Sequence, residues 1–175
     1  MDKPLNVVLI VGAPTAPDEL IRSALGGATP KSVLSRAAGR EVSVSLLSMA
    51  APADLDGFAS VHAVSPTRTH AIDRILGKLN LEGLLTALKA SPLGRLLISL
   101  GPTDSSRIFW RAVSADPHAM AMLHSADVLL AGDLPAVRTA WHLLRAKRVS
   151  AAFFGLQAAE KVFAARYAAN TQAER

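Results

Sequence analysis

The feature that most constrains the fold is a nearly continuous apolar run close to the amino terminus. Residues 6–11 read NVVLIV, and β-branched and aliphatic side chains fill nearly every position. A strand that is buried on both faces has this composition, as strands of parallel sheets do. Gly12, Pro14 and Pro17 follow at once and end the strand. The chain therefore begins with an expected interior strand of a parallel sheet.

Further strands are expected at intervals along the chain. Glu41–Leu47 alternates valine or leucine with serine, and Phe58–Val64 forms a weaker candidate. Asp127–Ala131 and Val149–Phe154 are short apolar runs bounded by turn residues. About five strands are thus expected, and the segments between them carry helical periodicity.

Helices are predicted by apolar spacing and by capping residues. Asp116-Pro117 and Asp133 with Pro135 are typical starts of helices. In the helix after Asp133, apolar side chains at i, i+3, i+4 and i+7 predict a stripe that faces the core. The basic side chains of the same helix predict an outer face that contacts solvent. The predicted helices cover residues 18–25, 30–38, 107–113, 117–124, 134–148 and 156–169; the expected core stripe is Val137, Ala140, Trp141 and Leu144, and the expected outer face is Arg138, His142 and Arg145. The segment 96–100, LLISL, fits either a helix or a strand.

Alternation of strands and helices predicts the fold class. Right-handed crossovers then give an α/β, Rossmann-like domain, with a mostly parallel sheet of about five strands and helices on both faces. A single domain is expected over residues 1–169, with a frayed tail at 170–175.

Composition excludes several classes of protein. Half of the 175 residues are hydrophobic, so the chain can bury a core and is not intrinsically disordered. The absence of cysteine excludes thiol catalysis and Cys-ligated zinc or iron–sulfur clusters, and it fits a cytoplasmic location. No apolar run approaches the about 20 residues of a transmembrane helix. The net charge of +5 is spread along the chain, which indicates solubility rather than specific nucleic-acid binding.

In an open parallel sheet, ligands bind outside the carboxyl ends of the strands. The candidate ligand-binding residues therefore lie in the turns that follow strands. They are Gly12, Ala13, Thr15, Thr67, Arg68, Gly132 and Asp133. Thr67 and Arg68 could hold an anion, although hydroxyls there could also cap a helix. Asp133 could bind a hydroxyl or act as a base, or it could simply cap a helix.

Motifs of known chemistry are not found. Ala13, Pro14 and Pro17 break the glycine pattern of a dinucleotide-binding turn, and no phosphate-binding Walker sequence occurs. His118 and His124 lack metal-ligand spacing, and His62 is expected to be packed or paired within a strand. We therefore expect no metal and no cofactor, and the catalytic residues are unknown.

Residues 126–154 read ADVLLAGDLPAVRTAWHLLRAKRVSAAFF. This segment resembles the amino-terminal domain of retaining GT-B glycosyltransferases of the family 4 type. In that family an "ADVVHAHD" strand precedes an alanine-rich helix and another strand. Asp127, Asp133, Ala136 and Ala140 match it, whereas Leu130 and Gly132 replace the two histidines of that turn. After the first strand, the Gly-Gly of the family is Gly12-Ala13 here.

The resemblance implies acceptor binding in this half of a GT-B enzyme and nucleotide-sugar binding in the other half. A whole enzyme needs about twice this length, so these residues alone are not expected to transfer sugar. The first hypothesis is an acceptor-binding or regulatory partner of a glycosyltransferase in glycan assembly. The alternatives are a non-enzymatic interaction protein, a small-molecule enzyme that uses Asp133 as base, and a nucleic-acid binder. The abundant alanine makes a homo-oligomer plausible.

Overall fold

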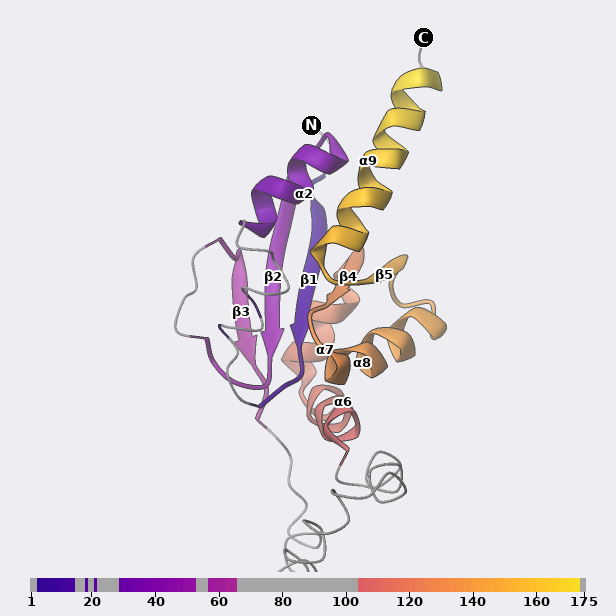
Figure 1. Cartoon of the computed structure of the whole chain (residues 1–175). Helices are drawn as coiled ribbons and strands as arrows, with labels where there is room; N and C mark the ends of the chain where they lie inside the picture. Colours follow the sequence, from indigo (N-terminus) through magenta and orange to yellow (C-terminus); the bar gives the residue numbers. More distant parts are fainter. Residues whose placement is uncertain are drawn as a thin grey trace, which may run out of the picture.

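The computed structural model describes residues 3–14, 18, 21, 29–52, 57–65 and 104–173, and it shows the expected α/β class (Figure 1). The strands are β1 (Leu5–Val11), β2 (Val42–Ser48), β3 (Ser60–Ala63), β4 (Val128–Ala131) and β5 (Ala151–Phe154). The helices are α2 (Pro30–Ala38), α6 (Ser105–Ala115), α7 (Pro117–His124), α8 (Leu134–Arg145) and α9 (Leu156–Ala173). Asp18 and Ile21, from the predicted helix 18–25, are helical.

All five strands are parallel, in the order β3-β2-β1-β4-β5. The apolar run of the sequence is therefore the central strand, with β2 on one side and β4 on the other. The chain first adds β2 and β3 on one side of β1, and it then crosses back to add β4 and β5 on the other side. The reversal between β1 and β4 is the switch point at which sheets of this kind bind ligands.

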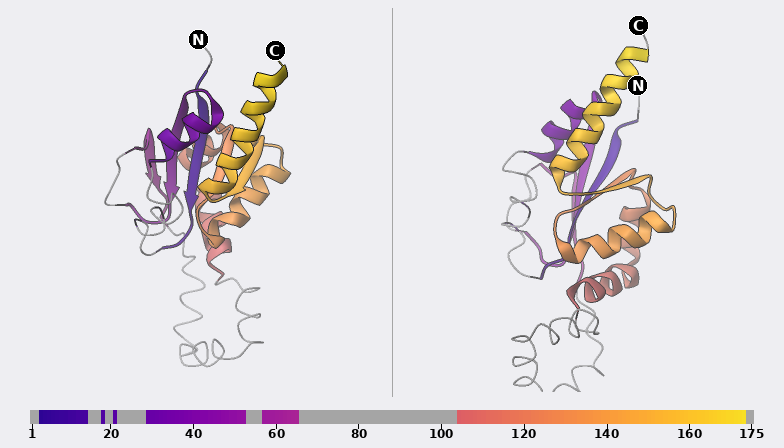
Figure 2. Two further views of the ribbon diagram at one scale, coloured as in Figure 1. Left: turned by 45° about the horizontal axis from the view of Figure 1, so that its top comes forward. Right: turned by 45° about the vertical axis from the view of Figure 1, so that its right-hand side comes forward.

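Two separate cores lie on the two faces of the sheet (Figure 2). On one face, Val8 and Ile10 of β1 pack with side chains from α6, α7 and α8. On the other, Val7, Leu9 and Val11 pack with α2 and α9. Because successive side chains of a strand point to opposite faces, one apolar run supplies both cores.

The predicted element boundaries agree with the structure to within a few residues. The helix at 30–38 is confirmed, and it ends at Gly39, whose φ of 64° is the left-handed conformation that favours glycine. Helix α8 ends at Arg145, so Lys147 and Arg148 follow it rather than form its last turn. Helix α9 continues to Ala173, into the segment for which fraying is predicted. The 96–100 segment lies outside the described residues.

Candidate functional site

The turns after β1 and β4 lie side by side at the carboxyl edge of the sheet. Ile10 pairs with Ala131, and the Gly132 N–H donates to the carbonyl of Ile10 at 2.8 Å. The pairing places Gly12 and Ala13 next to Gly132 and Asp133. Four of the seven candidate ligand-binding residues are thus brought together at the switch point.

Asp133 ties the two turns to each other. Its Oδ1 accepts from the N–H of Gly12 at 3.0 Å and from the N–H of Ala136 at 2.9 Å, and its Oδ2 accepts from the N–H of Ala13 at 2.7 Å. Asp133 is 7% exposed and is the N-cap of α8. Both carboxylate oxygens are therefore engaged, so the geometry supports the capping role of Asp133 over a role as a base.

This arrangement has a consequence for anion binding. Backbone N–H groups after a β-strand, together with the amino terminus of the following helix, are the usual ligands of a phosphate in Rossmann-like folds. Here the N–H groups of Gly12 and Ala13 and the first turn of α8 all bind the Asp133 carboxylate. The position of a phosphate at the switch point is filled by a side chain of the protein.

Gly12 is required by close packing. A Cβ at this position would lie 2.9 Å from Cδ1 of Phe109 and 2.9 Å from Cβ of Pro135. Phe109 belongs to α6 and is fully buried, and Pro135 lies in the first turn of α8. The glycine therefore lets both helices approach the end of β1.

The remaining candidates, Thr15, Thr67 and Arg68, lie outside the described residues. The anion binding predicted for Thr67 and Arg68 therefore stays a prediction.

The outward face of α8 differs from the sequence prediction. Its buried side chains are Ala136, Thr139, Ala140 and Leu143. Of the predicted core stripe only Ala140 is buried, whereas Val137, Trp141 and Leu144 are between 39% and 49% exposed. The prediction was wrong because Ala136, Thr139 and Ala140, together with Leu143, line the side of α8 that packs on the sheet and α6, and the other large apolar residues lie outside.

A shallow groove runs between α8 and α6. It has a volume of about 430 Å³ and is lined by Ser106 of α6 and by residues of α8, which are Leu134, Val137, Arg138, Trp141 and His142. The indole of Trp110 stacks on the imidazole of His142, with ring centroids 4.7 Å apart. The guanidinium of Arg145 lies 5.1 Å from the ring centre of Trp141. Burial, and then the cations of Arg138 and Arg145, lower the pKa of His142.

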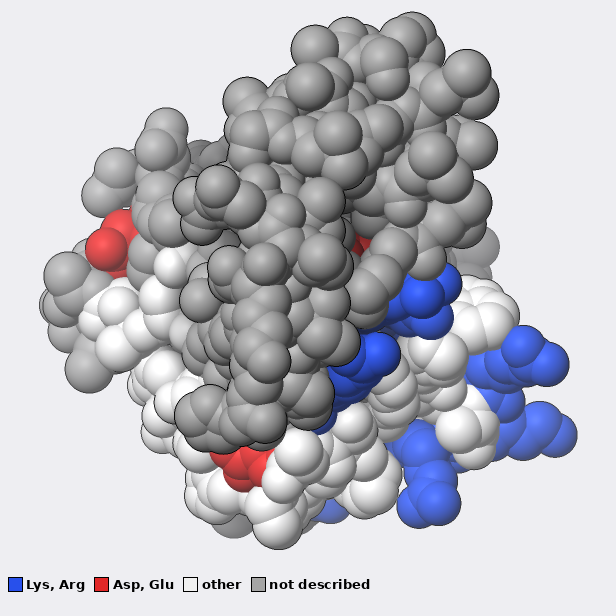
Figure 3. Space-filling model, turned by 90° about the horizontal axis from the view of Figure 1, so that it is seen from below, with Lys and Arg blue, Asp and Glu red and all other residues white. Residues whose placement is uncertain are grey.

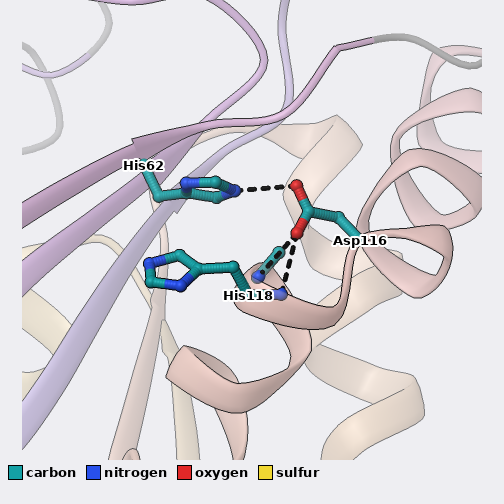
Figure 4. Close-up of polar contacts among 4 residues, drawn as sticks. His62, Asp116 and His118 are labelled. Atoms are coloured by element: carbon teal, nitrogen blue, oxygen red, sulfur yellow. Dashed lines mark hydrogen bonds and ion pairs between the residues drawn. The ribbon is translucent and has the colours of Figure 1, made fainter.

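One cluster was missed by the sequence prediction. His62 of β3 and Asp116, the N-cap of α7, form an ion pair with 2.7 Å between Nε2 and Oδ2 (Figure 4). The imidazole of His118 lies 4.6 Å from that of His62. The hydrogen bond from His62, with those from the Ala119 and His118 N–H groups, lowers the pKa of Asp116. The sequence did indicate the cap and a paired histidine, but the pairing depends on how α7 packs against the sheet.

Metal-binding clusters and membrane-crossing helices were sought in the described part of the chain. Among residues 3–14, 29–52, 57–65 and 104–173, no group of three His, Asp or Glu side chains is placed to hold a metal ion. Within the same residues, no helix combines the length and the apolar character needed to cross a bilayer. Comparison of the chain with protein-family models, with curated protein sequences and with solved structures gives no match.

Proposed function

We propose that the chain is a domain of the GT-B amino-terminal type that binds a glycan acceptor at the carboxyl edge of its sheet. On this proposal it does not transfer sugar by itself, and it serves as an acceptor-binding or regulatory partner in glycan assembly. The resemblance in residues 126–154 motivates the proposal, and the parallel sheet with its switch point between β1 and β4 is compatible with it.

The observation that carries the proposal is the bonding of Asp133. A domain that binds a nucleotide through its first turn needs free N–H groups after β1. The N–H groups of Gly12 and Ala13 instead bind Asp133, at 3.0 and 2.7 Å. This supports a division of labour in which the nucleotide-sugar is bound elsewhere and the acceptor binds at this edge.

Calorimetry and amide NMR shifts test this proposal. The purified chain is titrated with a panel of α- and β-linked oligosaccharides, and separately with UDP-glucose and GDP-mannose. We expect heat with an oligosaccharide, shifts of the Gly12, Ala13 and Gly132 amides, and no heat with the two nucleotide sugars. Nucleotide-sugar binding by the isolated chain, sugar transfer by it, or no heat with any oligosaccharide would each overturn the proposal.

A matched pair of variants localises the binding. Pro14 is exposed in the turn after β1, and Arg36 is exposed on α2. Pro14→Trp places a bulky ring at the carboxyl edge, and we expect it to abolish oligosaccharide binding. Arg36→Trp adds the same ring elsewhere and should leave binding unchanged. Equal binding by both variants would place the acceptor away from this edge.

The second candidate is a non-enzymatic interaction protein with a Rossmann-like core. The large apolar side chains exposed on α8 favour it, because contiguous exposed apolar surface marks protein interaction sites. A chain that binds no glycan but assembles with another protein would support this candidate instead.

A further inference from the structure

The outer face of α8 carries large apolar side chains in an unusual position. Leu134 is 77% exposed, Trp141 49%, Leu144 41% and Val137 39%. Their spacing of three, four and three residues places them along one side of the helix. Single exposed apolar residues are common, but four on one helix face form a continuous apolar strip. We call this strip, with the groove to α6, the α8 face.

The segment that contains α6, α7 and α8 has more cations than carboxylates, and its Arg and Lys side chains form no ion pair with a described residue. From residue 104 to 150 the chain has six Arg or Lys side chains and four aspartates. Each of these aspartates accepts a hydrogen bond from a backbone N–H group, so the carboxylates are used internally. The ion pairs between described residues join Lys31 to Glu41 and His62 to Asp116, and neither pair includes an Arg or Lys side chain from residues 104–150.

Two arginines of α8 are placed to contact a ligand on this face. Arg138 lines the groove, and its buried Nε–H has no acceptor. Arg145 lies over the ring of Trp141. A buried N–H without an acceptor is unfavourable, and a carboxylate is the acceptor that fits a guanidinium best. Seen from below, Lys and Arg side chains gather on one part of the surface, next to uncharged surface (Figure 3).

We propose that the α8 face binds an acidic segment of a partner protein, with an apolar side chain of that segment seated in the groove beside Trp141. Charge complementarity selects this partner: carboxylates would pair with Arg138 and Arg145 while the apolar strip is covered. Exposed tryptophan and arginine around a groove are the residues that most often dominate the affinity of protein interfaces. A second copy of this chain is disfavoured, since its α8 face would bring the same arginines against these.

The neighbouring edge of the sheet extends the same surface. Strand β5 is an edge strand, and no strand pairs with its outer side in the part of the chain that the structure describes. Phe154, at its end, is 57% exposed. The open edge lies beside α8, which packs on β5. The inference does not depend on glycan binding, because Trp141 and Arg145 lie in later turns of α8 than the switch point.

A random peptide library displayed on phage and selected against the whole chain tests the proposal. Enriched peptides are synthesised, and their affinities are measured by fluorescence anisotropy. We expect sequences that are rich in Asp and Glu around one aromatic or aliphatic residue, with affinity that falls as salt rises. Trp141→Ser and Arg138→Glu should each weaken binding by about tenfold or more, as hot-spot residues do.

Control measurements test whether the loss of peptide binding is specific to the α8 face. Arg166→Glu reverses an exposed charge on α9, on the other face of the sheet, and should leave peptide affinity unchanged. Circular dichroism melting of each variant shows that it is folded. Glycan titration of Trp141→Ser separates the two proposals: it should bind oligosaccharide as the wild type does.

Three outcomes would overturn the inference. The first is an enriched pool without acidic bias, or peptides that bind equally well to the Trp141→Ser variant. The second is a concentration-dependent dimer in sedimentation that Trp141→Ser abolishes, which would make a second copy the occupant. The third is a blue shift of tryptophan emission with phosphatidylglycerol vesicles or with duplex DNA that the Trp141→Ser variant lacks, in the absence of selective acidic peptides.

Discussion

The Oδ2 atom of Asp133 and the backbone nitrogen of Ala13 lie 2.7 Å apart, although 120 residues separate them in the sequence. The same carboxylate also caps α8 through the Ala136 N–H. One side chain therefore fixes the turn after β1, the turn after β4 and the start of a helix.

Replacing Asp133 by alanine should lower stability strongly. The change removes a helix cap, which costs about 1 kcal/mol, and leaves the buried Gly12 N–H without its acceptor, which costs about 1–3 kcal/mol. We expect a loss of about 2–4 kcal/mol in urea unfolding. Asp104→Ala is the matched control, since Asp104 caps α6 through one hydrogen bond and should cost about 1 kcal/mol. Equal losses in both variants would show that the bonds to Gly12 and Ala13 add nothing.

Gly12→Ala should destabilise the protein by about 1–3 kcal/mol, as overpacking of a dense core does. The added Cβ would meet Phe109 and Pro135 at 2.9 Å. Gly132→Ala is the control, because its Cβ would meet nothing closer than 3.2 Å. Thermal melting of both variants tests whether Gly12→Ala lowers the melting temperature more than Gly132→Ala does. A Gly12→Ala protein that melts no lower than Gly132→Ala would contradict the close approach of α6 and α8.

Acidification should weaken the fold through His142. Burial and two arginines lower its pKa in the folded protein, so the unfolded chain binds more protons near and below the ordinary histidine pKa of about 6.5. Stability from this group is complete above that pH and declines as the pH falls below it. We expect His142→Gln to lose less stability between pH 8 and 5.5 than the wild type does. His124→Gln, which changes an exposed histidine of α7, should follow the wild type.

Asp116 should contribute to stability at a lower pH. Its pKa is lowered by the hydrogen bond from His62 and by backbone N–H groups, so its contribution is present above the ordinary value of 3.8 and is lost as the pH falls through the lowered pKa. Asp116→Asn should flatten the acid limb of a profile of unfolding free energy against pH. An unchanged acid limb in Asp116→Asn would show that the pair with His62 adds no stability.

Most of the fold could be predicted from the sequence, because strands and helices have local signals. Residues 7–11 and 128–131 are short apolar runs bounded by polar or turn residues, as buried parallel strands are, and Asp116 and Asp133 precede prolines as helix caps do. The glycine, alanine and aspartate of the switch point were also identified, since loops after strands carry ligands in such sheets.

The parts that could not be predicted depend on packing between distant segments. The bonds from Asp133 to Gly12 and Ala13 require β4 to pair with β1, and the ion pair of His62 with Asp116 requires α7 to lie beside β3. In α8, apolar residues occupy more than one side of the helix, so spacing alone could not tell that Trp141 lies outside and Thr139 inside. Alanine and threonine have small side chains, so the side of α8 that carries them can approach the sheet and α6 closely, and the side with Trp141 faces outward.

The central place of β1 has a consequence for synthesis of the protein. Its first neighbour, β2, leaves the ribosome soon after it, but the second, β4, begins at Val128. Until then, the strand that later lies deepest in the sheet has one open side, and an open apolar strand readily pairs with other chains. Aggregation of the nascent chain should therefore be most severe before β4 emerges, and conditions that slow translation there should lower the yield.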